Sequence, residues 1–466
     1  MGHVRFIPCT TSSGSTRSVA DPQQATSQSI DLSAGPYPLG KRHVEVQHLF
    51  VDLPPRGHCK HLKEVYFESF APLFHILHDP TFDNQYEEFE QAPESMPLSW
   101  LALLFAILGT SVMALEPSSD ALNELSRKGS VAEQAAELSE RYRNAALRCL
   151  EADNYLWQQN VTTLQALIIL IYSINHSHGQ TWTLLGMTYH IALSLGCHVD
   201  PSEFNLDVIS SEERRRCWAG IMMLYMIQNT SMGNLGPNPW DASEGVQMPS
   251  DLNDRDLVVD EYVLPTATNH ASQMSYLLLK FRLYHISDEI ASVIRNSPKP
   301  QSSLIERLDR SISGEQQSWY DKYTAHQALN VLPTCHKVHF NILQGYAHQL
   351  MLLLHNHAMR TSTVETSQFR RSTSKIFSSA KEQLQIHNVF LTEPDYAPFG
   401  WYLRGICSFH AYHAAVSLVT ILVEQPWDET HGAILPILRR CAERFEALAE
   451  VSVICSKAAP VLKDML

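Results

Sequence analysis

The sequence predicts an all-α protein made of stacked antiparallel helix pairs. From residue 58 onwards, apolar residues recur every three or four positions in most segments, which is the spacing of one face of an α-helix. No segment shows the apolar–polar alternation of a half-buried strand. Short stretches rich in Pro, Gly, Ser and Asn separate the periodic segments, and short connections favour antiparallel neighbouring helices.

The periodic segments predict the helices in chain order. The first pattern begins at residue 58 and contains Pro72, which is expected to kink the helix or to divide it into two short ones. Residues 98–115 and 161–175 are apolar on nearly every side and are therefore expected in the core. The other helices are expected at 132–158, 180–196, 210 onwards, 272–296, 303–324, 336–360, 374–388, 402–424 and 431–451.

Composition divides the chain into three parts. Residues 1–57 are expected to be a disordered linker, because their first 40 residues are rich in Ser, Thr, Gln, Gly and Pro without apolar periodicity. Residues 58–300 are expected to form one large domain that includes a loop over 229–265. Residues 301–466 are expected to continue it as a helical C-terminal part.

Charge and cysteine spacing exclude several classes of function. The 35 basic residues are outnumbered by 49 acidic ones, which disfavours a dedicated nucleic-acid surface. The apolar run 98–115 is interrupted by polar residues and lacks basic flanks, so a buried helix is favoured over a membrane span. The nine cysteines are too scattered for a thiolate metal site and indicate the reducing cytosol or nucleus: Cys9, Cys59, Cys149, Cys197, Cys217, Cys335, Cys407, Cys441 and Cys455.

The sequence lacks the common catalytic motifs, which predicts no enzyme, no cofactor site and no metal site. The sequence has no Gly-x-Ser-x-Gly elbow, no Gly-rich phosphate loop and no His-Glu-x-x-His helix. His78 and Asp83 could act as a base and its orienting group, but a polar turn between helices is favoured. Histidines at 175–180, 355–357 and 410–413 lack acidic or thiol ligands at metal spacing beside them.

The stretch SSEERRRCWA, residues 210–219, places three arginines in a chain of net charge -14. Such a triplet could bind an anion such as a phosphate. Ser210 and Glu213 fit a capping box, so a helix is expected to begin at Ser210. Successive residues on that helix advance by about 100°, so the three arginines cannot all face one ligand.

A structural role is therefore favoured for the arginines. Arg214 is expected to share a buried face with Trp218, Ile221 and Tyr225, with its guanidinium bonded to a carboxylate or a backbone carbonyl. Arg215 is expected on another, exposed face, so that its replacement by alanine would cost under about 1 kcal/mol. If the Trp218 ring is buried, Trp218→Ala is expected to lower the free energy of unfolding by roughly 3–5 kcal/mol.

The segment around these arginines resembles the signature of the fungal-specific transcription factor domain, the middle homology region of fungal zinc-cluster regulators. The resemblance lies in SLGCHVDP (194–201), EERRRCW (212–218) and MPSDLNDRD (248–256), with weaker support from 66–89 and 348–360. It implies a structural role for the signature residues Asp200, Pro201, Arg214, Arg215, Arg216, Trp218 and Gly233. The second tryptophan of the family pattern is replaced by Ala219, and Tyr225 stands where an Asp is usual.

The resemblance implies a non-catalytic regulator of transcription, specific to a pathway such as a metabolic or secondary-metabolite gene set. The six-cysteine zinc cluster of the family is missing from these residues, and Cys9 and Cys59 cannot build it. DNA contact is therefore expected to be indirect or through a module absent from this chain. Expected partners are the transcription machinery or a DNA-binding protein, with a small-molecule effector, in the nucleus or in nucleus and cytoplasm. The alternative is a helical scaffold that binds or converts a small metabolite, with a pocket near 172–198.

Overall fold

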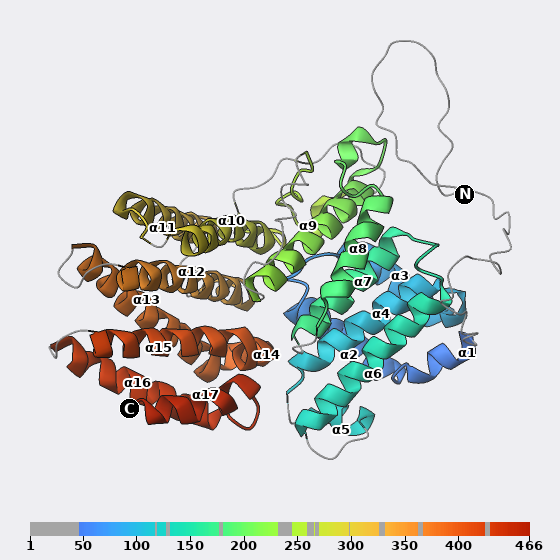
Figure 1. Cartoon of the computed structure of the whole chain (residues 1–466). Coiled ribbons are helices and arrows are strands. Elements are labelled where there is room, and N and C mark those ends of the chain that lie inside the picture. The colour runs from blue at the N-terminus through green and yellow to red at the C-terminus, as the bar shows by residue number, and fades with distance from the viewer. Residues whose placement is uncertain are drawn as a thin grey trace, which may run out of the picture.

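A computed structural model describes residues 46–116, 119–126, 131–176, 180–231, 245–258, 265, 270–297, 299–325, 331–361, 367–424 and 429–466. Every regular element in these ranges is a helix, which confirms the all-α prediction. The helices form two groups that lie side by side (Figure 1).

The first group runs from α1 to α9 and surrounds two apolar helices. Its elements are α1 (Val46–Leu49), η3 (Phe50–Asp52), α2 (Arg56–Ser69), α3 (Asp79–Gln91), η4 (Pro93–Ser95), α4 (Leu98–Ser111), η5 (Val112–Ala114), α5 (Asp120–Leu125), α6 (Val131–Ala152), α7 (Val161–His176), α8 (Trp182–Ser194), η6 (Pro201–Glu203) and α9 (Val208–Ser231). All residues of α4 from Ser99 to Ser111 are buried, as are those of α7 from Thr163 to Ser173. The prediction that both are core helices is confirmed.

The second group is a stack of helix pairs, drawn from yellow to red in Figure 1. Its elements are α10 (Ser275–Asn296), α11 (Ser302–Thr324), α12 (Thr334–Thr361), α13 (Ser367–Thr392), η10 (Pro394–Phe399), α14 (Gly400–Tyr402), η11 (Leu403–Cys407), α15 (Ser408–Glu424), α16 (Glu429–Ala447) and α17 (Val453–Asp464). The short helix η8 (Asp254–Asp256) lies between the groups in sequence and contacts α3. Consecutive helices pack on one another through most of the stack, which agrees with the predicted antiparallel pairs.

Several local predictions need correction. Part of the expected linker is helical, because α1 and η3 lie within 46–57 and the side chain of Leu49 is buried; residues 1–45 lie outside the described ranges. Pro72 lies in a turn after α2, so the pattern that begins near residue 58 gives one helix and a turn instead of two short helices. Helix α17 was not expected from the sequence; it begins after Ser452, whose hydroxyl accepts a hydrogen bond from the amide of Cys455.

The two groups share one core. The ring of Trp401 stacks on Phe70 with centroids 4.7 Å apart and meets His176 at 4.7 Å. A guanidinium nitrogen of Arg404 donates to the carbonyl of Met113 at 3.1 Å. Helix α10 packs against α11 and α12, so the domain boundary expected at residue 300 falls between helices that contact each other.

One stretch of the described helices, Pro394–Glu424, is long and apolar enough to cross a membrane by length and composition. Half of its most apolar window is buried inside the fold, and α15 packs against α12, α13, α16 and α17. These contacts are those of a core helix.

Candidate functional site

Helix α9 carries the arginine triplet and begins two residues earlier than the capping box predicts. The Asp207 carboxylate accepts hydrogen bonds from both the amide and the hydroxyl of Ser210, at 3.0 and 2.6 Å. Asp207 therefore caps the helix, and the predicted capping role of Ser210 is wrong. Glu213 does not reach back to Ser210; it accepts a hydrogen bond from Gln165 at 3.4 Å.

Arg214 bonds to the end of helix α8. Its guanidinium donates to the carbonyl of Leu195 at 2.8 Å, one of the carbonyls that the helix end leaves without an intrahelical partner. Gly196 follows with a φ of 76°, a left-handed conformation that glycine adopts freely at a helix C-terminus. A cation at this end is favourable, since the C-terminus of a helix carries partial negative charge. The backbone-carbonyl partner expected for Arg214 is thus present.

Arg215 forms a buried, two-pronged ion pair. Its Nε and Nη2 donate to the two carboxylate oxygens of Asp200, at 3.2 and 2.8 Å, and its Nη1 donates to Glu212 at 3.1 Å. Only 6% of Arg215 is exposed. The prediction of an exposed Arg215 is therefore wrong. Its partner Asp200 is 15 residues away in the sequence, and the geometry of α9 alone could not show that this residue packs against the helix.

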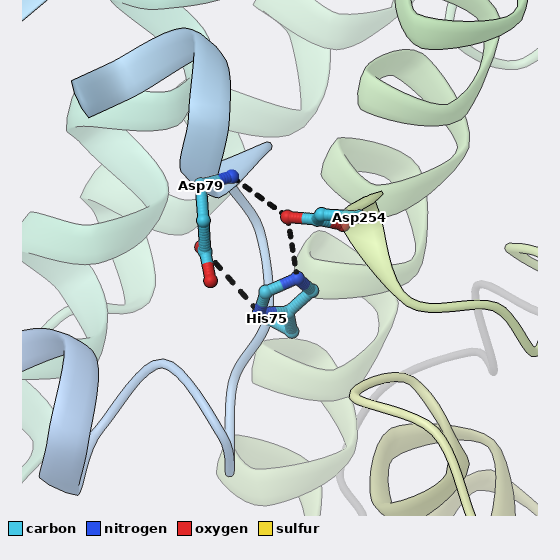
Figure 2. A group of neighbouring side chains, drawn as sticks. All are labelled: His75, Asp79 and Asp254. Atoms are coloured by element: carbon cyan, nitrogen blue, oxygen red, sulfur yellow. Dashed lines mark hydrogen bonds and ion pairs between the residues drawn. The ribbon is translucent and has the colours of Figure 1, made fainter. Parts of the chain in front are cut away.

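Arg216 is more deeply buried still and is bonded to two segments remote in sequence. Its Nη2 donates to Asp254 at 2.6 Å and its Nη1 to the carbonyl of Leu77 at 2.7 Å. The other carboxylate oxygen of Asp254 accepts from Nε2 of His75 at 3.0 Å and from the amide of Asp79 at 2.7 Å, as Figure 2 shows. One carboxylate thus holds α9 and the turn between α2 and α3 together.

The electrostatics of the site favour ionised acids beside the arginines. Burial alone would raise the pKa of Asp254, but hydrogen bonds from His75 and the positive charge of Arg216 hold that pKa well below its usual value. The pKa of Asp200 is likewise lowered, because bonds from Arg215 and from the Ser202 amide outweigh the effect of burial.

The segment after α9, residues 246–257, which we call the strap, binds Arg216 directly and also binds the two acidic partners of Arg215. The amide of Gln247 donates to Asp200 at 2.8 Å, and the amide and hydroxyl of Ser250 donate to Glu212, both at 2.9 Å. Asp254, near the end of the strap, binds Arg216. Ion pairs and backbone bonds therefore fix the strap along α9.

The strap also bonds to the second group of helices. Asp251 accepts hydrogen bonds from the hydroxyls of Ser272 and Ser275, both at 2.6 Å, and pairs with Lys322 of α11 at 2.6 Å. Gln273 bonds to the Asp254 amide and to the Asp79 carboxylate, at 2.8 and 2.9 Å. The arginines consequently hold a connection between the two groups of helices.

Three side chains of this site could in principle hold a metal ion. One ligand atom from each of His75, Asp79 and Asp254 lies within 4.8 Å of the others (Figure 2). However, Asp254 already accepts hydrogen bonds from Arg216, His75 and the Asp79 amide, and the adjacent guanidinium would repel a second cation. The arrangement fits a buried ion-pair network better than a metal centre.

The remaining signature residues have different environments. The Trp218 side chain is 3% exposed and packs near Tyr189, with ring centroids 5.7 Å apart. The predicted buried face is confirmed only in part: Ile221 is also buried, whereas Arg214 and Tyr225 are half-buried, and Tyr225 meets Tyr189 edge-on at 5.7 Å. Pro201 is buried and begins the short helix η6. Gly233 lies outside the described residues.

Three of the histidines considered as catalytic or metal residues, His78, His355 and His413, are hydrogen-bonded to polar side chains of the fold. His78 precedes α3 and bonds to Thr81 at 2.7 Å, while Asp83 pairs with Lys63 at 2.7 Å. The polar turn expected over 78–83 is therefore wrong: only His78 precedes the helix, and residues 79–83 are the first residues of α3. His355 bonds to Ser372, and His413 bonds to Gln349. Part of the 175–180 stretch, residues 177–179, lies outside the described residues.

Asp254 and His75 were missed by reasoning from sequence. The available signal was the acidic segment MPSDLNDRD, which lies after the arginines, but nothing local shows which acid meets which arginine. Asp254 is 38 residues from Arg216, and His75 is 179 residues from Asp254. Such pairings depend on tertiary packing.

Comparison with known proteins agrees with the signature. The family model of the fungal specific transcription factor domain matches residues 64–330, more than half of the 466 residues. The chain belongs to the fungal-specific transcription factor domain family. The match includes the complete arginine triplet, the strap and the turn that contains His75. The buried ion pairs thus lie within the fungal transcription factor domain.

Curated relatives of the domain are fungal regulators. An uncharacterized transcriptional regulatory protein of Schizosaccharomyces pombe is 25% identical over 361 residues, covering 77% of this chain and 54% of the relative. A Zn(2)-C6 fungal-type transcription factor of Macrophomina phaseolina is 24% identical over 461 residues, 90% of this chain and 59% of that protein. The aurofusarin cluster transcription factor of Gibberella zeae is 26% identical over 244 residues, 52% and 35% of the two chains. The chain spans about half the length of the curated relatives it matches.

Proposed function

We propose that this chain acts in a pathway-specific regulator of fungal transcription, controlling a metabolic or secondary-metabolite gene set. The observation that carries the proposal is the family match over 64–330, with the signature arginines in a defined buried network. Relatives named as pyrrolocin and aurofusarin cluster transcription factors support the choice of gene set.

The proposed role is non-catalytic and nuclear. The buried ionisable groups around α9 are paired with one another: Arg215 with Asp200, and Arg216 with Asp254. This mutual pairing suits a structural role. We infer that partners are the transcription machinery or a DNA-binding protein. The net charge of -14 supports DNA contact that is indirect, or made by a module outside these residues.

Gene replacement and chromatin immunoprecipitation test this proposal together. Loss of the gene should change the transcript levels of a coherent set of biosynthetic genes, and the full-length tagged protein should be recovered with their promoters. A strain that expresses Arg255→Met, a substitution of an exposed strap residue, should behave as the parent does. Unchanged transcripts on gene loss, with no recovery of any promoter, would contradict the proposal.

The alternative of a small-metabolite binding protein gains little from the region 172–198 where it was expected. Tyr172 stacks on Phe74 in the core at 4.4 Å, whereas Trp182 is 43% exposed beside an open surface hollow that Leu184 and Met187 also line. The aromatic residues described within 172–198 do not converge on one enclosed space. A different buried group, in the second group of helices, points more directly to a ligand.

A further inference from the structure

Lys280 is a buried lysine in the middle of an aromatic cluster. It lies on α10, is 8% exposed, and has its Nζ 3.9 Å from the ring centroid of Tyr346 on α12. The ring of Tyr284, one helical turn further along α10, is 5.8 Å from the same Nζ. Among the described residues, no carboxylate pairs with Lys280, although lysines are rarely buried without a partner. Cation–π contacts alone offset only part of the cost of removing this charge from water.

Two further polar atoms near Lys280 also lack partners. The Tyr346 hydroxyl, which lies near Ser287 but outside hydrogen-bonding geometry, is buried without a partner in the part of the chain that the structure describes. The same holds for Nδ1 of His410 on α15, whose ring is 6.3 Å from that of Tyr346. Buried polar atoms normally have hydrogen-bond partners. Three helices therefore bring an unpaired amine and two unpaired polar atoms to one place.

The surroundings restrict the ligand that would satisfy these groups. Burial raises the pKa of Tyr346 to about 12 and raises those of Tyr276 and Tyr284 further, so this interior disfavours negative charge that is not compensated. One ammonium compensates one negative charge, so a dianion such as a phosphate would retain an unpaired charge. The aromatic rings around Lys280 would pack favourably against an apolar part of the ligand.

We propose that Lys280, Tyr346 and His410 form an internal binding site for the carboxylate of a small monoanion with an apolar or aromatic body. The Lys280 ammonium pairs with the carboxylate, and the Tyr346 hydroxyl donates a hydrogen bond to it. The four-carbon stem of lysine lets the amine swing from the Tyr346 ring to the ligand. As the site of an effector, this inference rests on the proposed regulatory function, whereas ligand binding itself does not require DNA or partners.

Ligand binding at this site is coupled to proton uptake. Burial lowers the pKa of Lys280 to about 7, and no charge of a neighbouring described residue opposes that shift. Of the groups around it, His410 has a pKa lowered to about 3 by burial and by the Lys280 charge, and Tyr346 stays protonated. His413, beyond His410, also has a lowered pKa because of burial. Between pH 7 and 9 Lys280 therefore changes charge, and a carboxylate binds its protonated form.

Isothermal titration of the purified full chain with benzoate tests the site, and benzamide serves as the uncharged control ligand. Saturable benzoate binding is expected at millimolar or lower concentration, with affinity falling up to about tenfold per pH unit above pH 7 and with proton uptake seen in buffers of different ionisation enthalpy. Benzamide should bind at least about tenfold more weakly.

Variants localise the effect. Lys280→Met should weaken benzoate binding at least about tenfold, and Tyr346→Phe, which keeps the ring, should weaken it by roughly tenfold. Lys463→Met, at an exposed lysine of α17, should bind as the parent does. Absence of benzoate binding, equal binding by Lys280→Met, or affinity independent of pH would each overturn the site. The titrations use no DNA, so a lack of benzoate binding would not contradict the proposed regulatory function. Conversely, a failure to recover promoters would not contradict the ligand site.

Discussion

At the scale of single residues, the three consecutive arginines have three different partners. Arg214 bonds to a helix end, Arg215 to Asp200 and Glu212, and Arg216 to Asp254 and a carbonyl of the α2–α3 turn. Their different directions follow from helix geometry, whereas their partners depend on where the chain returns. No external anion is needed to explain the triplet.

Replacement of Arg216 by Met should lower the free energy of unfolding by about 3–5 kcal/mol, because it leaves the Asp254 carboxylate buried without its cation. Urea denaturation measures this loss. Arg255→Met, at an exposed arginine in the strap, should change stability by less than about 0.5 kcal/mol. In a double-mutant cycle, Asp254→Asn should lower the free energy of unfolding much less in the Arg216→Met background than in the parent. Strictly additive losses of stability would contradict a direct pairing of the two residues.

Lys280 should make stability depend on pH in the alkaline range. Its pKa is lowered to about 7 in the folded chain and is ordinary, about 10.4, in the unfolded chain. Between these two pKa values the unfolded state binds more protons than the folded state, so the free energy of unfolding rises with pH. Below pH 7 the folded chain bears the full cost of burying the charged amine. The stability of the parent relative to Lys280→Met should therefore increase from pH 7 to 10 by an amount on the order of 3–4 kcal/mol. A difference that is constant with pH would show that Lys280 is charged throughout.

At the scale of elements, α9 packs unusually closely against its neighbours. A Cβ added to Gly220 would lie 2.5 Å from Cδ1 of Ile76 and 3.3 Å from Cγ2 of Ile168. The absence of a side chain at this position lets α9 approach both α7 and the α2–α3 turn that Arg216 binds.

Gly220→Ala should therefore destabilise the fold by about 1–3 kcal/mol, because the new methyl group overpacks the contact. Gly314→Ala is the matched control: Gly314 lies in α11, and an added Cβ there would have no atom within 4 Å. That change should stabilise by about 0.5–1 kcal/mol through helix propensity. Thermal melts of both variants measure the contrast, and stabilisation by both changes would show that the contact at Gly220 has room.

The helices that are buried on all faces were predictable from sequence, whereas α3 and α17, each buried on one face, were not predicted. The apolar runs of α4 and α7 identify core helices because only a buried helix tolerates apolar residues all round. The start of α9 was misplaced because Asp207 and Ser210 are both good caps and only the helix ladder selects between them. Asp254 and Lys280 could not be assigned, since their roles depend on helices far away in the sequence.

At the scale of the whole molecule, the strap connects the two groups of helices. Its Asp254 is held by Arg216 of the first group, and its Asp251 is held by Lys322 and two serines beside α10 in the second. The stacked rings of Phe70 and Trp401 form a second, apolar connection. The family signature thus coincides with a structural joint within the domain.

Hydrogen exchange of the backbone amides tests this central role of the arginines most directly. In Arg216→Met, peptides from the strap should exchange about tenfold faster or more than in the parent, before α4 loses protection, because their anchor on α9 is lost. In Arg255→Met the strap should exchange as it does in the parent. Unchanged protection of residues 246–257 in Arg216→Met would contradict the account.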